Sequence, residues 1–344
     1  MAITMDAHAR PPESMRETYK RYQKSNAEAV LGQPDLVQLD GERDCCDAAK
    51  PTHDVGLPDH LCEIFAQFLD REPGACSCVD PVRNRRVYEV PKVPGLYIYP
   101  SLLSPAVQIE LLDKLLHRDV SNSRHSTNVH RFHHVTYPAS DTTASSSSFF
   151  SPAAASATFE PLDPFIHKPF GIQQFWNKKL RWITLGGQYD WTEKQYPPES
   201  PPDFPTDIKK LVEDIFPMKA EAAILNLYSP GDTLSLHRDV SEESDQPLVS
   251  ISIGCDAIFI AGLEKDDASC GKCSMAAIRL RSGDAVLMSG PSRYAWHGVP
   301  KVLPNTCPEW LQTWPATEKS PHFEAWKNWM AGKRINLNVR QMFD

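Results

Sequence analysis

The chain has 344 residues, of which 41% are hydrophobic and 9% aromatic, and its formal net charge is −8 at pH 7. This apolar content suffices for a sizeable core, and because no run of 18 apolar residues occurs, the sequence excludes a helical membrane span. The acidic balance excludes a uniformly basic surface, so any contact with nucleic acid must come from a local patch.

Two amphipathic stretches stand in the N-terminal part of the chain. Apolar side chains at helical spacing predict one helix over residues 14–31, with Met15, Tyr19 and Tyr22 on a shared stripe. The same spacing predicts a second helix over residues 58–70.

A third helix is predicted after Ser104, an N-cap candidate that precedes a proline at the first helical position. It ends in the pentapeptide HRDVS, which holds His117 and Asp119. Residues two apart on a helix point about 200° away from each other, so these two side chains cannot easily face one ion. We interpret this copy of the pentapeptide as a coincidence.

The middle of the chain joins a Ser/Ala-rich stretch to an aromatic and basic one. Residues 139–161 are low in complexity and predict a disordered insertion. Residues 171–196 are dense in aromatic side chains, lysine and arginine, and a helix is predicted over residues 207–216.

Residues 221–344 differ from the preceding part of the chain in their sequence pattern. Short apolar or alternating segments, separated by Pro, Gly and Asp, are typical of an antiparallel barrel or jelly roll. The predicted fold class is therefore α+β, with a jelly-roll core, supporting helices and an N-terminal helical extension.

The second copy of HRDVS lies in a strand-like segment of this part. In a strand, His237 and Asp239 would share a face, about 7 Å apart at the backbone. His297 follows a later strand, and two histidines with one carboxylate form the facial triad of non-haem Fe(II) oxygenases. Either residue pattern alone would more often be a polar strand end or a packed histidine.

The last predicted strand places Arg334, Asn336, Asn338 and Arg340 on one face and apolar residues on the other. A guanidinium on a half-buried strand needs an anion, and it matches a carboxylate through two parallel hydrogen bonds. The pattern predicts an anion pocket beside the metal site, unless the face is simply exposed.

The nine cysteines are irregularly spaced, and the N-terminal stretch lacks a charged segment followed by an apolar one. Both features predict reduced thiols inside a cell, in the nucleus, the cytoplasm or a mitochondrion. Cys270 and Cys273 have zinc-knuckle spacing, but a closed site needs four ligands, which favours two free thiols.

Together these motifs resemble the AlkB family of Fe(II)/2-oxoglutarate dioxygenases. The resemblance rests on N-x-Y, H-x-D nine residues after the Tyr, a later His and R-x-N-x-x-x-R, and the stretch PLVSISIGCDAIFIAGL is similar to the eukaryotic branch numbered first among AlkB homologues. It implies a double-stranded β-helix core over residues 221–344, a substrate-recognition region over 91–220 and an extension over 1–90.

The resemblance also implies roles for individual residues. It implies that His237, Asp239 and His297 bind Fe(2+), and that 2-oxoglutarate, used with O2, is bound by Asn226, Tyr228, Arg334, Asn336 and Arg340. It implies that Trp182, Tyr189, Trp191, Ser241 and Glu242 contact the substrate. Ser241 departs from the family pattern, which has an acidic residue at this position.

The implied activity is oxidative demethylation of nucleobases in nucleic acid, with release of formaldehyde, succinate and CO2. Methylated adenine in RNA is the leading expectation, and DNA stays open. The alternative is a 2-oxoglutarate oxygenase that hydroxylates a protein or a small molecule. The sequence gives no sign of a membrane or of an obligate protein partner.

Overall fold

The computed structural model describes residues 9–39, 48–52, 55–72, 86–138, 148–189, 201–264, 273–317 and 320–343. Strands of the larger sheet are β2 (Lys50–Thr52), β3 (Val87–Glu89), β4 (Leu96–Tyr99), β7 (Trp182–Gly186), β8 (Ala222–Tyr228), β10 (Leu248–Gly254), β13 (Ala285–Met288) and β15 (Arg334–Arg340). Those of the smaller sheet are β1 (Leu36–Val37), β9 (Leu234–His237), β11 (Ala257–Leu263), β12 (Ser274–Leu280) and β14 (Trp296–Val302).

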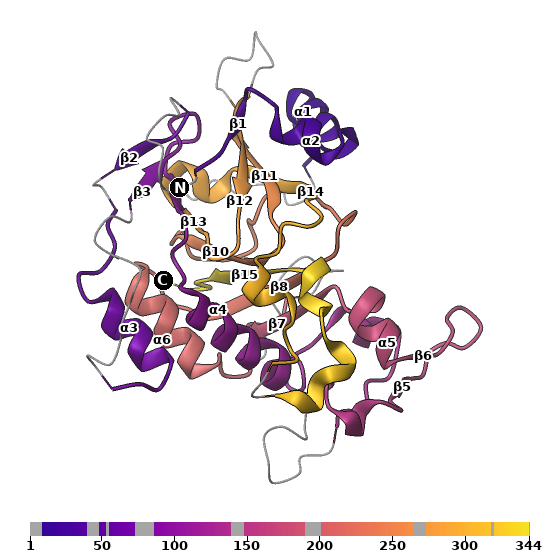
Figure 1. Cartoon of the computed structure of the whole chain (residues 1–344). Coiled ribbons are helices and arrows are strands. Elements are labelled where there is room, and N and C mark those ends of the chain that lie inside the picture. Colours follow the sequence, from indigo (N-terminus) through magenta and orange to yellow (C-terminus); the bar gives the residue numbers. More distant parts are fainter. Residues whose placement is uncertain are drawn as a thin grey trace.

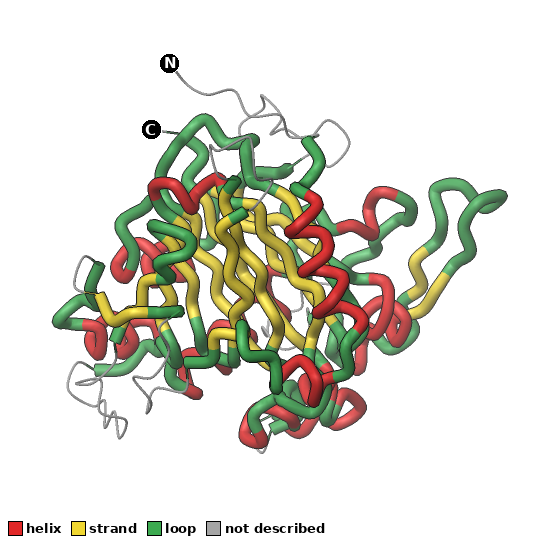
Figure 2. Tube along the Cα trace, turned by 90° about the horizontal axis from the view of Figure 1, so that it is seen from above, coloured by secondary structure: helices red, strands yellow, loops and turns green. Residues whose placement is uncertain are grey.

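The strand order in the larger sheet is β2-β3-β4-β13-β10-β15-β8-β7, and in the smaller sheet β1-β12-β11-β14-β9. Pairing is antiparallel throughout the described strands except between β1 and β12. In Figure 2 the strands run side by side through the centre, with helices around them. The strands of the C-terminal part thus form the middle of both sheets.

Strand β15 shows how the sequence pattern sets this arrangement. Its apolar residues Ile335, Leu337 and Val339 are 1% exposed or less and pack into the main core. Successive side chains of a strand point to opposite faces, so the Arg and Asn residues between them turn toward the smaller sheet. The polar face of β15 therefore lines the space between the two sheets.

Helices cover the outside of this core. They include α1 (Glu13–Lys24), α2 (Ala27–Leu31), α3 (Leu61–Phe68), α4 (Pro105–Leu112), α5 (Ile172–Gln174), α6 (Thr206–Ile215) and α7 (Glu309–Gln312). Helices α3, α4 and α6 lie below the larger sheet in Figure 1, whereas α1 and α2 lie at the opposite end, near β14. In the described residues no helix has the length and apolar character needed to cross a bilayer.

The N-terminal helix differs from its prediction in one respect. The expected helix over residues 14–31 is broken at Ser25, because the side chain of Asn26 accepts a hydrogen bond from the Ala29 N–H and starts a new helix. Met15, Tyr19 and Tyr22 are buried as predicted, against the outer face of the smaller sheet.

Tyr19 links this helix to two strands at once. Its hydroxyl donates to the carbonyl of Leu234 in β9, at 3.1 Å, and lies 3.4 Å from the carbonyl of Val299 in β14. The register of β9 and β14 is irregular between His297 and Val299. The hydroxyl therefore supports the edge strand β9 where its ladder is weakest.

The expected disordered insertion is wrong for residues 148–161, while residues 139–147 lie outside the described part of the chain. Phe149 and Phe150 are each 1% exposed, and Phe150 stacks on Trp176 with ring centroids 3.9 Å apart. A short hairpin of β5 (Thr158–Phe159) and β6 (Phe170–Gly171) follows and projects from one side (Figures 1 and 2). Two phenylalanines outweigh the serines around them because aromatic burial dominates core energetics.

Candidate metal centre and anion pocket

The pairing of β9 with β14 brings two histidines together. His237 and His297 lie directly opposite each other in this antiparallel pair, and their ring centroids are 4.3 Å apart. Opposite residues of an antiparallel pair hold their Cβ atoms about 4.5–5.5 Å apart, so the strand register alone sets this approach.

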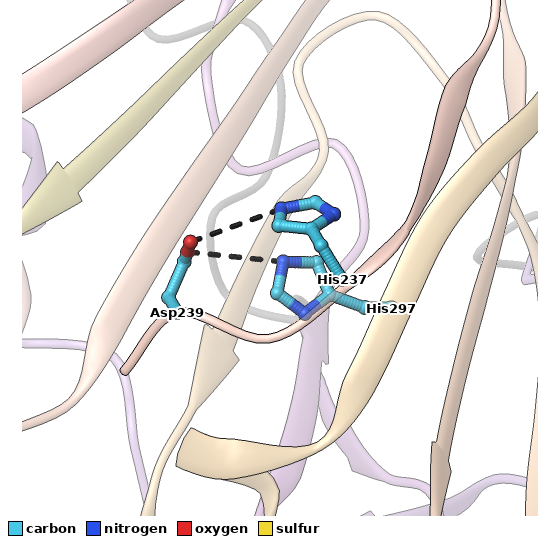
Figure 3. Close-up of side chains that lie close together, drawn as sticks. All are labelled: His237, Asp239 and His297. Atoms are coloured by element: carbon cyan, nitrogen blue, oxygen red, sulfur yellow. Dashed lines mark ion pairs between the residues drawn. The ribbon is translucent and has the colours of Figure 1, made fainter. Parts of the chain in front are cut away.

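Asp239 completes the cluster from a position just beyond the strand. The sequence predicts that Asp239 shares a strand face with His237, but β9 ends at His237, so Asp239 lies in the following loop. Its two carboxylate oxygens each lie 3.8 Å from a histidine Nε2 atom, one from His237 and the other from His297. Figure 3 shows the carboxylate facing both rings, and the ligand atoms of the three residues all lie within 4.8 Å of one another.

Hydrogen bonds on the far side of each imidazole fix which nitrogen is available. Nδ1 of His237 lies 2.9 Å from the carbonyl of Ser235, and Nδ1 of His297 lies 3.0 Å from that of Ala295. A carbonyl can only accept, so each Nδ1 carries the proton and each Nε2 keeps its lone pair for a ligand. Burial, with His237 nearby, lowers the pKa of His297 to about 4, so this ring is neutral at physiological pH.

The charge of Asp239 is held by basic neighbours. Burial alone would raise the pKa of Asp239, but Arg340, the two imidazoles and Arg293 outweigh it and hold the pKa well below its usual range. Arg340 donates from Nη2 to Oδ2 of Asp239 at 2.7 Å. Two imidazoles that turn Nε2 toward an ionised carboxylate, at these spacings, fit a divalent transition metal such as Fe(II).

A cavity of about 260 Å³ opens beside the cluster, between the two sheets. Its wall includes His237, Asp239 and His297 together with apolar side chains such as Leu248 and Phe259. Polar side chains of β15 and β8 also line it; they are Arg334, Asn336, Asn338, Arg340 and Asn226. The cavity therefore has a metal-binding cluster and a set of hydrogen-bond donors around one apolar space.

Arg334 is buried in this cavity wall with unused bonding capacity. It is 1% exposed, and burial lowers its pKa from the ordinary value. Nη2 donates to Ser252 Oγ at 2.8 Å and Nη1 to the carbonyl of Cys255 at 3.4 Å, whereas the buried Nε has no partner. Among the described residues Arg334 makes no ion pair, so the guanidinium fits an anionic ligand.

Of the other residues expected to bind the keto-diacid, Asn226, Asn336 and Arg340 line the same cavity as Arg334. Tyr228 lies directly opposite Arg334 in the β8–β15 pair, and its buried hydroxyl also has no partner, although it does not line the cavity. Asn226 lies opposite Asn336, whose amide donates to Ser250 Oγ at 2.9 Å. Four of the five residues predicted for this pocket thus line one cavity, and Tyr228 is next to Arg334 in the sheet without lining it.

The residues expected to contact substrate are less uniformly placed. Tyr189 and Ser241 line the cavity and their hydroxyl oxygens lie 3.3 Å apart. Trp182 is half-buried on β7 and does not line the cavity, and Trp191 lies outside the described residues. Glu242 lines the cavity but its carboxylate is held by two arginines.

The histidine and the aspartate of the first HRDVS have separate partners in the structure. His117 lies 2.8 Å through Nδ1 from Ser148 Oγ and stacks on Phe323, while Asp119 pairs with Arg118. In the part of the chain that is described, the triad of His237, Asp239 and His297 is the one group of this kind able to hold a metal.

Sequence reasoning missed two residues that support the site. The hydroxyl of Ser252 accepts a hydrogen bond from Arg334. The alternation of Ser and Ile in β10 could have revealed that the serine hydroxyls of this strand share one face. Arg293 contacts the loop of Asp239, and no local pattern marks it. Cys273 is a free thiol, and Cys270 lies outside the described residues.

Comparisons with known proteins agree with this geometry. A family model described as the 2OG-Fe(II) oxygenase superfamily matches residues 95–340. The chain is 42% identical over 361 residues to a protein named N6-methyladenosine RNA demethylase ALKB1 from Pyricularia oryzae, with 98% of each covered. It is 50% identical over 225 residues to N6-methyladenosine RNA demethylase ALKBH from Cryphonectria parasitica. That alignment covers 63% of this chain and 100% of the relative. It is 38% identical over 266 residues to tRNA demethylase abh1 from Schizosaccharomyces pombe, covering 75% and 82%.

Proposed function

Because the chain belongs to the 2OG-Fe(II) oxygenase superfamily, in the AlkB branch of its ALKB1-type relatives, we propose that it oxidatively demethylates nucleobases in nucleic acid. N6-methyladenine in RNA is the proposed leading substrate, because the relatives matched over most of their length are named as RNA demethylases. Members of this family use Fe(II), 2-oxoglutarate and O2. Formaldehyde, succinate and CO2 are the expected products.

One observation carries the proposal. The His–Asp–His cluster lies in the same cavity as a buried guanidinium that has an unused donor and, among the described residues, no carboxylate partner. The first group suits a ferrous ion, and the second suits the distal carboxylate of 2-oxoglutarate. Few other chemistries need both features in one apolar cavity.

We propose the following division of roles. His237, Asp239 and His297 would hold Fe(II), and Arg334 would pair with the distal carboxylate of 2-oxoglutarate, with Asn226, Tyr228, Asn336 and Arg340 around it. Bound iron would supply the oxidation of the methyl group, with 2-oxoglutarate and O2 consumed. The protein's own contribution is to fix the ligand atoms, neutralise the diacid and keep the cavity wall apolar.

Substrate residues follow from their positions at or near the cavity. Ser241 and Tyr189, whose hydroxyls are 3.3 Å apart, would border the base in the cavity. A methylated base must leave its stack to enter such a space, and an aromatic side chain such as Trp182 would hold it. Trp191 and Glu242 stay predicted substrate contacts.

We further infer that the two facing sheets form a double-stranded β-helix core over residues 221–344. Residues 91–220 would form the substrate-recognition region and residues 1–90 an extension. Strands from both earlier parts pair with the outer strands of this core and so extend its two sheets.

The test uses methylated oligonucleotides and mass spectrometry of the nucleosides. RNA with N6-methyladenine, tRNA with N1-methyladenine and single-stranded DNA with N6-methyladenine are incubated with enzyme, Fe(II) and 2-oxoglutarate. We expect methyl loss from RNA with matching formaldehyde release, and none with Asp239→Ala. Succinate release without methyl loss from any nucleic acid would instead indicate a protein or small-molecule hydroxylase.

A further inference from the structure

Arg293 is a buried arginine that lies four residues before His297, and its hydrogen bonds go to the loop that carries Asp239. It is 1% exposed and sits on a 3-10 turn over Gly290–Tyr294. Its Nη1 donates to the backbone carbonyl of Asp239 at 2.8 Å, and its Nε donates to the carbonyl of Gln246 at 3.0 Å. One guanidinium therefore fastens both ends of the loop that carries Asp239.

The third donor of Arg293 enters an ion-pair network. Nη2 donates to Oε2 of Glu242 at 3.0 Å, and the other oxygen of Glu242 lies 3.2 Å from Nε of Arg340. Arg340 in turn donates to Oδ2 of Asp239 at 2.7 Å. Asp239, Arg340, Glu242 and Arg293 thus form a closed ring in which acidic and basic residues alternate.

The four side chains of this ring are largely buried, which restricts their positions. The side chains of Arg293 and Glu242 are 1% and 3% exposed, and those of Arg340 and Asp239 are 5% and 14% exposed. Breaking a buried pair leaves an uncompensated charge, so the members hold one another in a single arrangement. The ring holds Asp239 at two points, its carboxylate through Arg340 and its backbone carbonyl through Arg293.

We propose that Arg293 is a positioning residue for the metal centre, which it serves by fixing Asp239 toward His237 and His297. The proposal rests on the proposed function, since it assumes that this triad binds iron. Partners that orient metal ligands commonly contribute about 10- to 100-fold to metal affinity. Arg293 spans Asp239, Glu242 and Gln246 from one planar group, which a lysine cannot reproduce.

The experiment measures Co(II) binding to metal-free protein by its visible absorption, without turnover. We expect Arg293→Met to weaken Co(II) binding about 10- to 100-fold and to alter the absorption spectrum, because Asp239 loses one of its two anchors. Arg293→Lys should recover part of the affinity. The matched control is Arg118→Met, which removes the partner of the buried carboxylate of Asp119 in the first HRDVS, far from the triad in the chain.

A double variant separates positioning from stability. Arg293→Met with Glu242→Gln removes one positive and one negative charge, so it should melt closer to the wild type than Arg293→Met alone, yet still bind Co(II) weakly. Arg118→Met should melt lower with unchanged Co(II) affinity.

Two results would overturn the inference: Co(II) affinity of Arg293→Met or of the double variant within about threefold of wild type, or an equal loss in Arg118→Met. A wild-type protein that binds no Co(II) would instead reject the proposed function itself.

Discussion

Replacing Arg334 by Met should have opposite effects on stability and on ligand binding. In the protein without ligand this guanidinium is buried, and no described carboxylate pairs with it. Replacing a buried charge by an apolar side chain of similar size is often neutral or stabilising, by up to about 4 kcal/mol. Ser252 Oγ and the Cys255 carbonyl lose weak donors, so we expect a net gain between zero and about 3 kcal/mol.

The same change should nearly abolish 2-oxoglutarate binding. Each hydrogen bond to a charged group contributes about 1.5–3 kcal/mol, and a guanidinium offers two to a carboxylate. Losing both corresponds to at least about a hundredfold in the dissociation constant of 2-oxoglutarate.

Thermal unfolding with and without 2-oxoglutarate, in Ni(II) to prevent turnover, measures both effects together, and calorimetric titration gives the affinity. The variant should melt at or above the wild-type temperature without ligand, and 2-oxoglutarate should no longer raise it. A variant that melts clearly below wild type, yet still responds to 2-oxoglutarate, would refute the reasoning about Arg334.

Three further changes test other parts of the molecule. Trp182→Ala should lower demethylation of RNA about tenfold to a hundredfold, by the roughly 1–3 kcal/mol of base stacking, while succinate release without RNA persists. Asp239→Asn should remove the rise in melting temperature that Co(II) gives the wild type, about 2.7 kcal/mol at a hundredfold excess over Kd. Burial lowers the pKa of His117 to about 4, below its unfolded value near 6.5, so the unfolded chain binds more protons between these pH values. Stability is therefore lost as the pH falls through this window, and His117→Gln should lose about 2 kcal/mol less than wild type from pH 7 to 5 in urea unfolding.

The parts of the fold and site that follow from the sequence are those encoded by local periodicity. Alternation along β15 predicted the inward face of Arg334, and H-x-D with a later histidine predicted the cluster that His237, Asp239 and His297 form. Strand geometry converts such patterns directly into shared faces. Asp239 joins the cluster although it lies in a loop, because a ligand only has to point its carboxylate at the metal site and need not be part of a strand.

The parts that could not be predicted depend on contacts between distant segments. Arg293 and Asp239 are 54 residues apart, and Arg340 and Asp239 are 101 apart, so no window of sequence holds the ring. Phe149 and Phe150 were hidden by the serines and alanines around them, and their role depends on Trp176 further along the chain. The composition of residues 139–161 describes only that segment, whereas the burial of Phe150 depends on its contact with Trp176.

The hydrogen bonding of Tyr19 with β9 and β14 imposes an order on folding during synthesis. The hydroxyl approaches a carbonyl 280 residues later in the chain, in β14. Helix α1 leaves the ribosome before the strands on which it docks, and closing so long a loop is entropically unfavourable. The apolar stripe of this helix therefore stays unburied until the chain has been translated through β14.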